Sequence, residues 1–322
     1  MSVWVLTDGK AGDELQCLGV AEELTSSPVI HRIHPRAPWY WFTPYGPIDP
    51  KDRPDRPSSP LAPPYPDCVI ASGRRAVPYL RAIRTLSPST FTVFLKDPKT
   101  GAGTADLIWV PDHDRLRGKN VITTITPPHR MTGSRLERAR REKDPRLARL
   151  GHPLAAVLVG GKSRHHDFSQ EDIRHFVSRL ESLIGNGVHL AITTSRRTPA
   201  ELDEALKQLV ATHPGHFLWD GSGENPYAAM LALSDAIVAT ADSFNMIGEA
   251  AATGTPVFVF DPSGGHPKLT AFIEALRRYG AVHPLTERLE AAPYKPLDAT
   301  QFIADRIKQE MARKNRLPAA SL

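Results

Sequence analysis

Residues 235–257, with the sequence DAIVATADSFNMIGEAAATGTPV, contain the pattern that decides the fold. Residues 236–239 form a short apolar run that is typical of a buried strand. A helix is expected from about Ser243, because serine is a favoured N-cap residue, and it ends at Gly254, where a positive φ angle is expected. Residues 257–260 form another apolar strand. A strand, a helix and a second strand in this order indicate a right-handed crossover between parallel strands.

The same alternation of strands and helices runs through most of the 322 residues. It indicates an α/β protein with parallel sheets. We predict two Rossmann-like domains that face each other across a cleft, over residues 1–150 and 151–322, with the last helix crossing back to the first domain. Ligands of such folds lie beyond the carboxyl ends of the strands. Further strands are expected at residues 3–6, 28–33, 68–71, 91–95, 107–110, 121–124, 155–159, 190–194 and 217–219.

Composition favours a cytoplasmic protein. Hydrophobic residues make up 41% of the chain, yet no run approaches the eighteen or so apolar residues of a membrane-spanning helix. The apolar run at the start is too short for a signal peptide and lacks a basic leader. Cys17 and Cys68 are the two cysteines, which fits a reducing compartment and provides no disulfide framework.

Charge is spread unevenly along the chain. Residues 1–150 hold 23 lysines and arginines against 16 aspartates and glutamates, whereas residues 151–322 hold 17 against 19. A basic half suggests an acidic partner, either a nucleic acid or an anionic membrane face. The alternative is a solvated arginine-rich helix at residues 135–149. No recognisable nucleic-acid-binding module is present, so we do not expect a nucleic-acid partner.

Residues 35–66 are rich in proline and predict a long loop with a short turn. The turn contains Trp39, Tyr40, Trp41 and Phe42. Tryptophan and tyrosine favour membrane interfaces, and neighbouring arginines favour anionic lipid. This loop is therefore a candidate for peripheral contact with the inner face of a membrane or with a lipid-linked acceptor. The alternative is a loop that packs on its own domain.

The start of the helix at Ser243 predicts a phosphate site. The first turn of a helix presents backbone N–H groups and the positive end of the helix dipole, and the serine hydroxyl adds a donor. The carboxylate of Glu249 suits the hydroxyls of a ribose. We assign Asp242, Ser243, Asn245, Met246 and Glu249 to this site. The alternative is an ordinary Rossmann helix.

The pattern resembles the donor-binding signature of GT-B glycosyltransferases, with serine at a helix start, then Glu249-Ala250, then Gly254-Thr255-Pro256-Val257. In those enzymes the glutamate contacts the nucleotide ribose, and the helix start faces the diphosphate. The resemblance implies a GT-B-like fold and a nucleoside diphosphate sugar as substrate.

Residues at the ends of two other strands are expected near the same ligand. Gly160 and Gly161 follow the strand at 155–159, and glycine lets a ligand approach the backbone. Lys162, Ser195 and Arg196 supply positive charge and a hydroxyl, which would neutralise a leaving diphosphate without a metal. Solvated turns are the alternative.

In the first half, Thr7-Asp8-Gly9-Lys10-Ala11-Gly12 joins a strand to a helix but is neither a Walker A motif nor GxGxxG. Asp8 and Lys10 are the candidate catalytic groups, with Asp8 as the base. The remaining candidate cleft residues of this half are Gly9, Gly12, Gln16, Gly73, Arg74, Lys96 and His113.

Short motifs are spread along nearly the whole chain: DGKAG at 8–12 with Gln16, ASGRR at 71–75, KDP at 96–98, PDHD at 111–114, GG at 160–161, GENPY at 223–227 and TADS at 240–243. Together they resemble the bacterial branch of the mitochondrial-fission "elongated mitochondria" family. Plant members are named for recruiting dynamin-like proteins, and the resemblance implies one pocket built from the shared motifs. One departure is Asp13-Glu14, where the resemblance leads us to expect a histidine or an asparagine beside the glycine. If a histidine there serves as a base, this chain lacks it.

Two motifs suggest metals but are better explained without them. Asp112-His113-Asp114 has the DxD form of another glycosyltransferase fold, and His113 is a second candidate base. Arg164-His165-His166-Asp167 is explained by a solvated loop or by phosphate contacts. We predict neither a metal nor a cofactor.

These patterns predict a glycosyltransferase that transfers a sugar to an envelope or lipid-linked acceptor. A nucleotide-sugar epimerase on the same fold and a non-catalytic fission-type adaptor are the alternatives.

Overall fold

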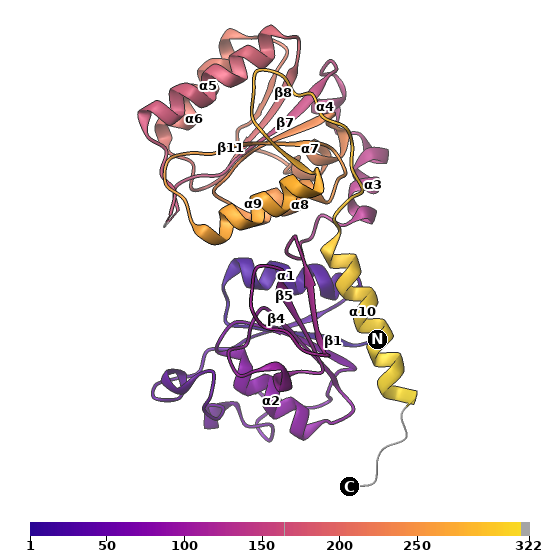
Figure 1. Ribbon diagram of the computed structural model, residues 1–322. Helices are drawn as coiled ribbons and strands as arrows, with labels where there is room; N and C mark the ends of the chain where they lie inside the picture. Colours follow the sequence, from indigo (N-terminus) through magenta and orange to yellow (C-terminus); the bar gives the residue numbers. More distant parts are fainter. Residues whose placement is uncertain (164, 317–322) are drawn as a thin grey trace. The chain divides into compact units, whose positions relative to one another are not determined.

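The computed structural model describes residues 1–163 and 165–316, which form two compact units (Figure 1). Unit 1 consists of residues 1–130 together with α10 (Ala299–Arg316), and unit 2 of residues 131–298. The division lies at Arg130, not at residue 150. Residues 131–150 belong to unit 2 because α3 (Gly133–Glu142) buries Leu136 and Ala139, and Arg140 Nε of this helix donates to the carbonyl of Ala232.

Unit 1 contains a six-stranded parallel sheet with the order β2-β1-β3-β4-β5-β6. Each strand is four or five residues long. The direction in which successive strands are added reverses between β1 and β3. This sheet confirms all six strands expected in the first half. Their bounds are β1 (Val3–Thr7), β2 (Val29–Arg32), β3 (Cys68–Ser72), β4 (Phe91–Leu95), β5 (Leu107–Pro111) and β6 (Val121–Thr124).

Both faces of the unit 1 sheet are covered. Side chains alternate along each strand, so that Val3 and Val5 join one cluster and Trp4 and Leu6 join the other. The first cluster contains residues of α1 (Ala11–Glu22) and α10, including Cys17 and Ile303. The second contains residues of α2 (Ala76–Leu86) and of the proline-rich loop. The layers are therefore helix, sheet and helix with loop.

The proline-rich loop has little regular structure, as predicted, apart from the short 3₁₀ helices η1 (Trp39–Phe42) and η2 (Pro50–Asp52). Two buried carboxylates fasten it. Asp49 accepts two hydrogen bonds from the Arg36 guanidinium, which holds the pKa of Asp49 well below its usual range. Asp52 accepts from the Tyr79 hydroxyl of α2 at 2.5 Å, and burial first and this bond second raise the pKa of Tyr79.

Unit 2 contains a second six-stranded parallel sheet, ordered β12-β11-β10-β7-β8-β9. Counted from its first strand, this is the 3-2-1-4-5-6 order of a Rossmann fold, with the reversal between β7 and β10. We did not predict β12, which has only three residues. The strands are β7 (Leu154–Val159), β8 (His189–Thr194), β9 (Phe217–Trp219), β10 (Ala236–Thr240), β11 (Val257–Phe260) and β12 (Val282–Pro284).

Two helices of unit 2 begin in different ways. Ser169 caps α5 (Gln170–Gly185) with a capping box, because its hydroxyl and Asp172 exchange hydrogen bonds with each other's backbone. Pro199 is the N-cap residue of α6 (Ala200–Thr212), where no side chain caps the helix. The hydroxyl of the preceding Thr198 donates to the carbonyl of Gly160 at 2.5 Å. The other helices are α4 (Pro145–Ala148), α7 (Tyr227–Leu233), α8 (Phe244–Ala251) and α9 (Pro267–Tyr279).

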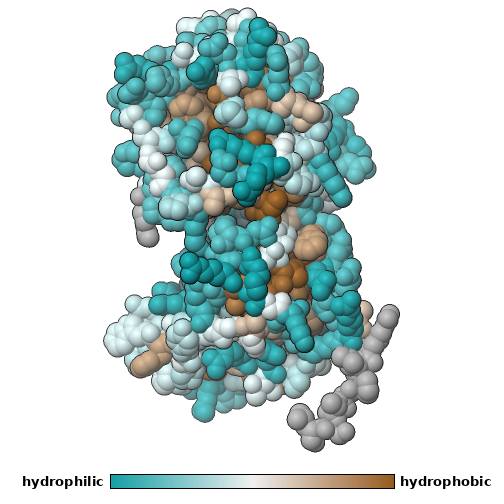
Figure 2. Space-filling model, in the orientation of Figure 1, coloured by the Kyte–Doolittle hydropathy of each residue, from teal (hydrophilic) through white to brown (hydrophobic). Residues whose placement is uncertain are grey.

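Hydrophilic residues predominate on the face of the molecule shown in Figure 2. Within residues 1–163 and 165–316, no helix has both the length and the apolar character needed to cross a membrane.

Candidate functional site

The parallel sheets bring the predicted residues together at their carboxyl edges. In unit 1, β1 leads to Asp8, β3 to Gly73, β4 to Lys96 and β5 to His113. In unit 2, β7 leads to Gly160, β8 to Ser195 and β10 to Asp242. The strand order of each unit reverses among these strands, and ligands of open α/β sheets bind beyond the strand ends at such a reversal.

Asp8 lies at the reversal point of unit 1, between the ends of β1 and β3. Its side chain is only 4% exposed, and one oxygen, Oδ2, lies 3.3 Å from Lys10 Nζ. The other oxygen, Oδ1, is buried and has no hydrogen-bond partner among the described residues. A buried carboxylate oxygen without a partner is costly, so it marks a place where a hydrogen-bond donor is missing.

Two glycines surround this carboxylate. Gly9 and Gly73 have φ angles of +80° and +93°, which few residues other than glycine adopt. A Cβ atom at Gly73 would lie 2.7 Å from Cγ of Asp8. Gly73 therefore makes room for the carboxylate of Asp8.

The other predicted residues of unit 1 differ in their contacts. Lys96 has a φ angle of +84°, and its amine is bound to Asp13 on α1. Asp13 therefore has a structural role at the position where a histidine or an asparagine was expected. Gly12 and the buried Gln16 lie in α1, whereas Arg74 is exposed beyond the end of β3 and has no hydrogen bond or ion pair within the described part of the chain.

Glu14, beside Asp13, also has a partner. It accepts two hydrogen bonds from the guanidinium of Arg32, at 2.9 and 2.7 Å, and these bonds lower the pKa of Glu14. The acidic pair Asp13-Glu14 thus ties α1 to β4 and β2.

Asp242 occupies the reversal point of unit 2. Its side chain is fully buried and all of its hydrogen bonds are made inside the unit. Oδ2 accepts from the Gly161 N–H at 3.0 Å and from the Arg197 guanidinium at 2.9 Å, while Oδ1 accepts from the Thr240 hydroxyl at 2.7 Å. Asp242 therefore positions the loop after β7.

The glycines of that loop make room for protein atoms, which differs from their predicted role. A Cβ atom at Gly160 would lie 2.1 Å from Oδ1 of Asp242, and one at Gly161 would lie 2.0 Å from the carbonyl oxygen of Arg197. The loop after β7 and the loop after β8 are thus packed backbone against backbone. A ligand at this edge of the sheet would therefore contact the outer side of these two loops.

Lys162, Ser195 and Arg196 lie on these two loops. Lys162 Nζ is 3.0 Å from the carboxylate of Asp167. The Ser195 N–H donates to the Thr198 hydroxyl oxygen at 2.9 Å, so Ser195 belongs to the turn that begins α6. Arg196 is exposed and has no hydrogen bond or ion pair to any described residue, which leaves its guanidinium available to an anion.

Ser243 is the N-cap of α8, as predicted. Its hydroxyl oxygen accepts from the Met246 N–H at 3.4 Å. Asn245 and Met246 are half-buried in the first turn. Gly254 has the predicted positive φ angle, +79°. The start of α8 is thus a serine-capped helix N-terminus, a form that an ordinary Rossmann helix shares with a phosphate-binding one.

Glu249, two turns into α8, is half-buried and paired with Tyr227 of α7. The Tyr227 hydroxyl donates to Glu249 Oε2 at 2.7 Å, and Oε1 has no hydrogen bond within the described residues. Burial raises the pKa of Glu249, and the bond from Tyr227 partly offsets this effect. Burial and the neighbouring carboxylate raise the pKa of Tyr227 well above 10. Tyr227 was not assigned a role from the sequence, although it ends the GENPY motif.

The histidine and aspartate motifs have local partners. The carbonyls of Asp112 and Asp114 accept from the Arg117 guanidinium, and His113 is half-buried beside them. His165 and His266 have ring centroids 4.4 Å apart, while Arg164 of the same motif lies outside the described residues. Among the residues that the structure describes, no three histidine, cysteine or acidic side chains are grouped so that they could hold a metal ion.

Comparison with known proteins identifies the family. A model described as Mitochondrial fission ELM1 matches residues 11–311. The chain belongs to that family. It is 28% identical over 276 residues to the Mitochondrial fission protein ELM1 of Arabidopsis thaliana, a match that covers 77% of this chain and 65% of the plant protein. The chain therefore spans less than two thirds of that relative.

A second relative matches along almost its whole length. The Uncharacterized protein RP120 of Rickettsia prowazekii (strain Madrid E) is 25% identical over 352 residues, which cover 96% of this chain and 98% of that protein. Among solved structures, the UDP-GlcNAc 2-epimerase of Methanocaldococcus jannaschii, in complex with UDP-GlcNAc and UDP, is similar with a TM-score of 0.52 and 11% identity. That match covers 96% of this chain and 100% of the epimerase. The ELM1-family chain thus has a GT-B-like fold built from two Rossmann-like units.

Proposed function

We propose that the carboxyl edge of the unit 2 sheet binds a nucleoside diphosphate sugar and that the protein transfers the sugar to a hydroxyl acceptor. The observation that carries this proposal is the Glu249 carboxylate. Tyr227 holds one of its oxygens, and the other makes no hydrogen bond among the described residues. A carboxylate oriented in this way on the helix that begins at Ser243 suits the two hydroxyls of a ribose whose diphosphate lies at the helix start.

Positive charge on the neighbouring loops supports the same ligand. Arg196 has no partner within the described chain, and Lys162 is exposed beside Asp167. Their charges would stabilise the diphosphate as it leaves, a role that a metal ion fills in other transferases. The M. jannaschii epimerase, which shares the fold, was solved with UDP-GlcNAc and UDP, so a uridine nucleotide is the first ligand to test.

The transfer step needs a base that accepts the proton of the attacking hydroxyl. As the hydroxyl oxygen bonds to the sugar C1, the bond from C1 to the diphosphate breaks, and the proton passes to the base. Asp8 is our candidate, because its unpaired Oδ1 lacks a donor in the structure. A carboxylate already saturated by hydrogen bonds, such as Asp242, is less suited to this role.

Two other functions fit the family and the fold. An epimerase would use the same nucleotide-sugar pocket without a second substrate. A fission-type adaptor, suggested by the family description, would bind a protein partner and would not need the pocket. The Glu249–Tyr227 pair favours a ligand-binding protein, because Tyr227 fixes a carboxylate whose second oxygen has no hydrogen bond among the described residues, and a ligand would supply that donor.

The test is a thermal-shift measurement with UDP, UDP-GlcNAc and the corresponding adenine and guanine diphosphates and sugars. A ligand that binds only the folded protein raises the melting temperature. We expect a rise with one nucleotide, a much smaller rise in Glu249→Gln, and a reduced rise in Tyr227→Phe. Glu181→Gln, which changes an exposed glutamate on α5, is the matched control and keeps the full shift.

Incubation with the donor alone, followed by chromatography, then separates the activities. An isomerised sugar nucleotide supports the epimerase, and release of nucleotide only when an acceptor is added supports the transferase. No shift with any nucleotide at millimolar concentration leaves the adaptor as the remaining function.

A further inference from the structure

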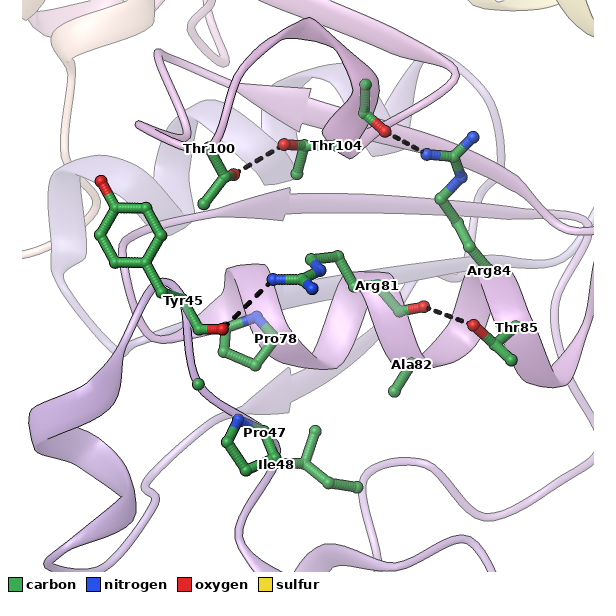
Figure 3. Close-up of a pocket in the computed structure, with 12 residues that line it drawn as sticks. Tyr45, Pro47, Ile48, Pro78, Arg81, Ala82, Arg84, Thr85, Thr100 and Thr104 are labelled. Atoms are coloured by element: carbon green, nitrogen blue, oxygen red, sulfur yellow. Dashed lines mark hydrogen bonds between the residues drawn. The ribbon is translucent and has the colours of Figure 1, made fainter.

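The outer face of α2 in unit 1 forms one side of a large groove that the proposed sugar transfer does not use. Its volume is about 960 Å³. In Figure 3, α2 lies between two segments that complete the groove. One is the loop at Tyr45, and the other is the 3₁₀ helix η3 (Ala102–Thr104). The lining consists of Tyr45, Gly46, Pro47, Ile48, Pro78, Arg81, Ala82, Arg84, Thr85, Thr100, Gly103 and Thr104.

The lining is positively charged. It contains two arginines and three threonines, and no carboxylate is among its residues. Arg81 donates one long hydrogen bond, 3.4 Å, to the carbonyl of Tyr45 and has no acidic partner within the described chain. Arg84 donates to the carbonyl of Gly103, and Asp106 lies 3.8 Å from its guanidinium (Figure 3). Arg81 is therefore the cation in the groove that remains available to an anion.

Three exposed aromatic residues lie on the loop that forms one wall of the groove. Tyr45, which lines the groove, is 69% exposed, and Trp41 and Phe42 of the preceding η1 helix are 64% and 55% exposed. The N–H groups of Tyr45 and Gly46 both donate to the carbonyl of Phe42, at 2.9 and 2.8 Å. The exposed aromatic side chains and this wall of the groove thus belong to one hydrogen-bonded loop.

We propose that this groove binds an anionic phospholipid, whose phosphate head group carries a net negative charge. The phosphate would be bound by Arg81, and the hydrocarbon would pass along Tyr45, Ile48 and Pro78 towards the bilayer. Trp41 and Phe42 would lie at the membrane interface, which tryptophan and other aromatic residues favour. A soluble anion would account for the arginine, but it would leave three large exposed aromatic residues unexplained.

This site is independent of the proposed sugar transfer, because none of its residues belongs to the nucleotide site. The buried carboxylate–tyrosine bond from Asp52 to Tyr79 fixes α2 against the loop, so the groove is preformed.

The experiment is co-sedimentation of the full-length protein with vesicles of phosphatidylcholine alone and of phosphatidylcholine mixed in equal parts with phosphatidylglycerol. We expect binding to the mixed vesicles only. Arg81→Gln should lower the partition coefficient about fivefold, the value of one basic residue at an anionic surface. The double change Trp41→Ser and Phe42→Ser should lower it by more than about tenfold, because the side chains no longer enter the apolar layer.

Two controls match the variants in chemistry. Arg149→Gln removes an exposed arginine of unit 2, and Phe302→Ser removes an aromatic residue of α10 that is 49% exposed on the opposite layer of unit 1. Both should bind vesicles as the unchanged protein does. Melting curves of all variants verify that these surface changes leave the fold intact.

Other outcomes would overturn the proposal. If Arg149→Gln weakens binding as much as Arg81→Gln, the vesicles respond to the net charge of the protein, and the groove is not a specific site. If inorganic phosphate alone raises the melting temperature through Arg81 while no vesicle is bound, the groove takes a soluble anion. Equal binding to both vesicle compositions would show that the groove does not select an anionic head group.

Discussion

Unit 1 and unit 2 each place an aspartate directly beyond a central strand at the point where the strand order reverses, but the two carboxylates differ in their hydrogen bonds. Asp242 in unit 2 is saturated by the Gly161 N–H, the Thr240 hydroxyl and Arg197. Asp8 in unit 1 has one oxygen near the exposed Lys10 and the other without a partner among the described residues. Two aspartates at similar positions thus differ: the carboxylate of Asp242 is saturated with hydrogen bonds, and that of Asp8 is not.

The difference separates a structural carboxylate from a functional one. A saturated carboxylate stabilises the loops that donate to it, and its removal leaves those donors unpaired. An unsaturated buried carboxylate costs stability and is retained where a ligand supplies the missing donor. The comparison therefore predicts opposite responses to substitution at the two positions.

The largest effect is expected from Asp242→Ala. The change leaves the Gly161 N–H and the Thr240 hydroxyl without their acceptor and Arg197 without its ion pair, so the free energy of unfolding should fall by about 3 kcal/mol. Urea unfolding followed by tryptophan fluorescence measures the loss. Hydrogen exchange should increase in β7 and β10 and remain unchanged in β1 and β3. A loss below about 1 kcal/mol would contradict a structural role.

A smaller effect is expected from Gly160→Ala. The new Cβ would lie 2.1 Å from an oxygen of Asp242 that cannot turn away without breaking its bonds, so we expect a loss of about 2 kcal/mol. Gly133→Ala is the matched control in the same unit, because a Cβ at Gly133 meets no atom within 4 Å. That control should unfold at the same urea concentration or a higher one. Equal behaviour of the two variants would rule out the packing assigned to Gly160.

The smallest change in stability is expected from Asp8→Asn. Asparagine has nearly the same shape and removes a buried charge whose Oδ1 has no partner among the described residues, and it gives up only an ion pair with an exposed lysine. The free energy of unfolding should therefore stay constant or rise by up to about 1 kcal/mol. Sugar transfer, once the donor is known, should fall while nucleotide binding persists. A loss of stability as large as that of Asp242→Ala would show that the two carboxylates are equivalent.

The fold was largely predictable because each strand is a short apolar run and each is followed by a helical pattern. The strand β12 was missed since its three residues carry no periodicity. The boundary at residue 150 was placed too late. The arginine-rich α3 looks like a solvated linker in the sequence, yet its buried residues Leu136 and Ala139 pack in unit 2.

The site was less predictable, because the sequence shows which residues end a strand but not which of them face each other. A glycine after a strand looks the same in the sequence whether it makes room for a ligand or for other atoms of the protein. Gly160 makes room for the Asp242 side chain and Gly161 for the backbone of Arg197. The bond from Tyr227 to Glu249 joins residues that are far apart in the sequence. Asp8 was identified from its position alone, and its unpaired oxygen became visible only in the structure.

The return of α10 to unit 1 has a consequence for the order in which the protein is made. Ile303, Ala304 and Ile307 of this helix complete the cluster that contains Cys17 and Trp109. The Thr300 hydroxyl exchanges hydrogen bonds with the backbone of His129, so the two chain segments that lead out of and back into unit 1 are joined. As the ribosome synthesises residues 1–130 first, that unit emerges without its last helix. Unit 2, whose residues are contiguous, is then the first to obtain its full set of core residues.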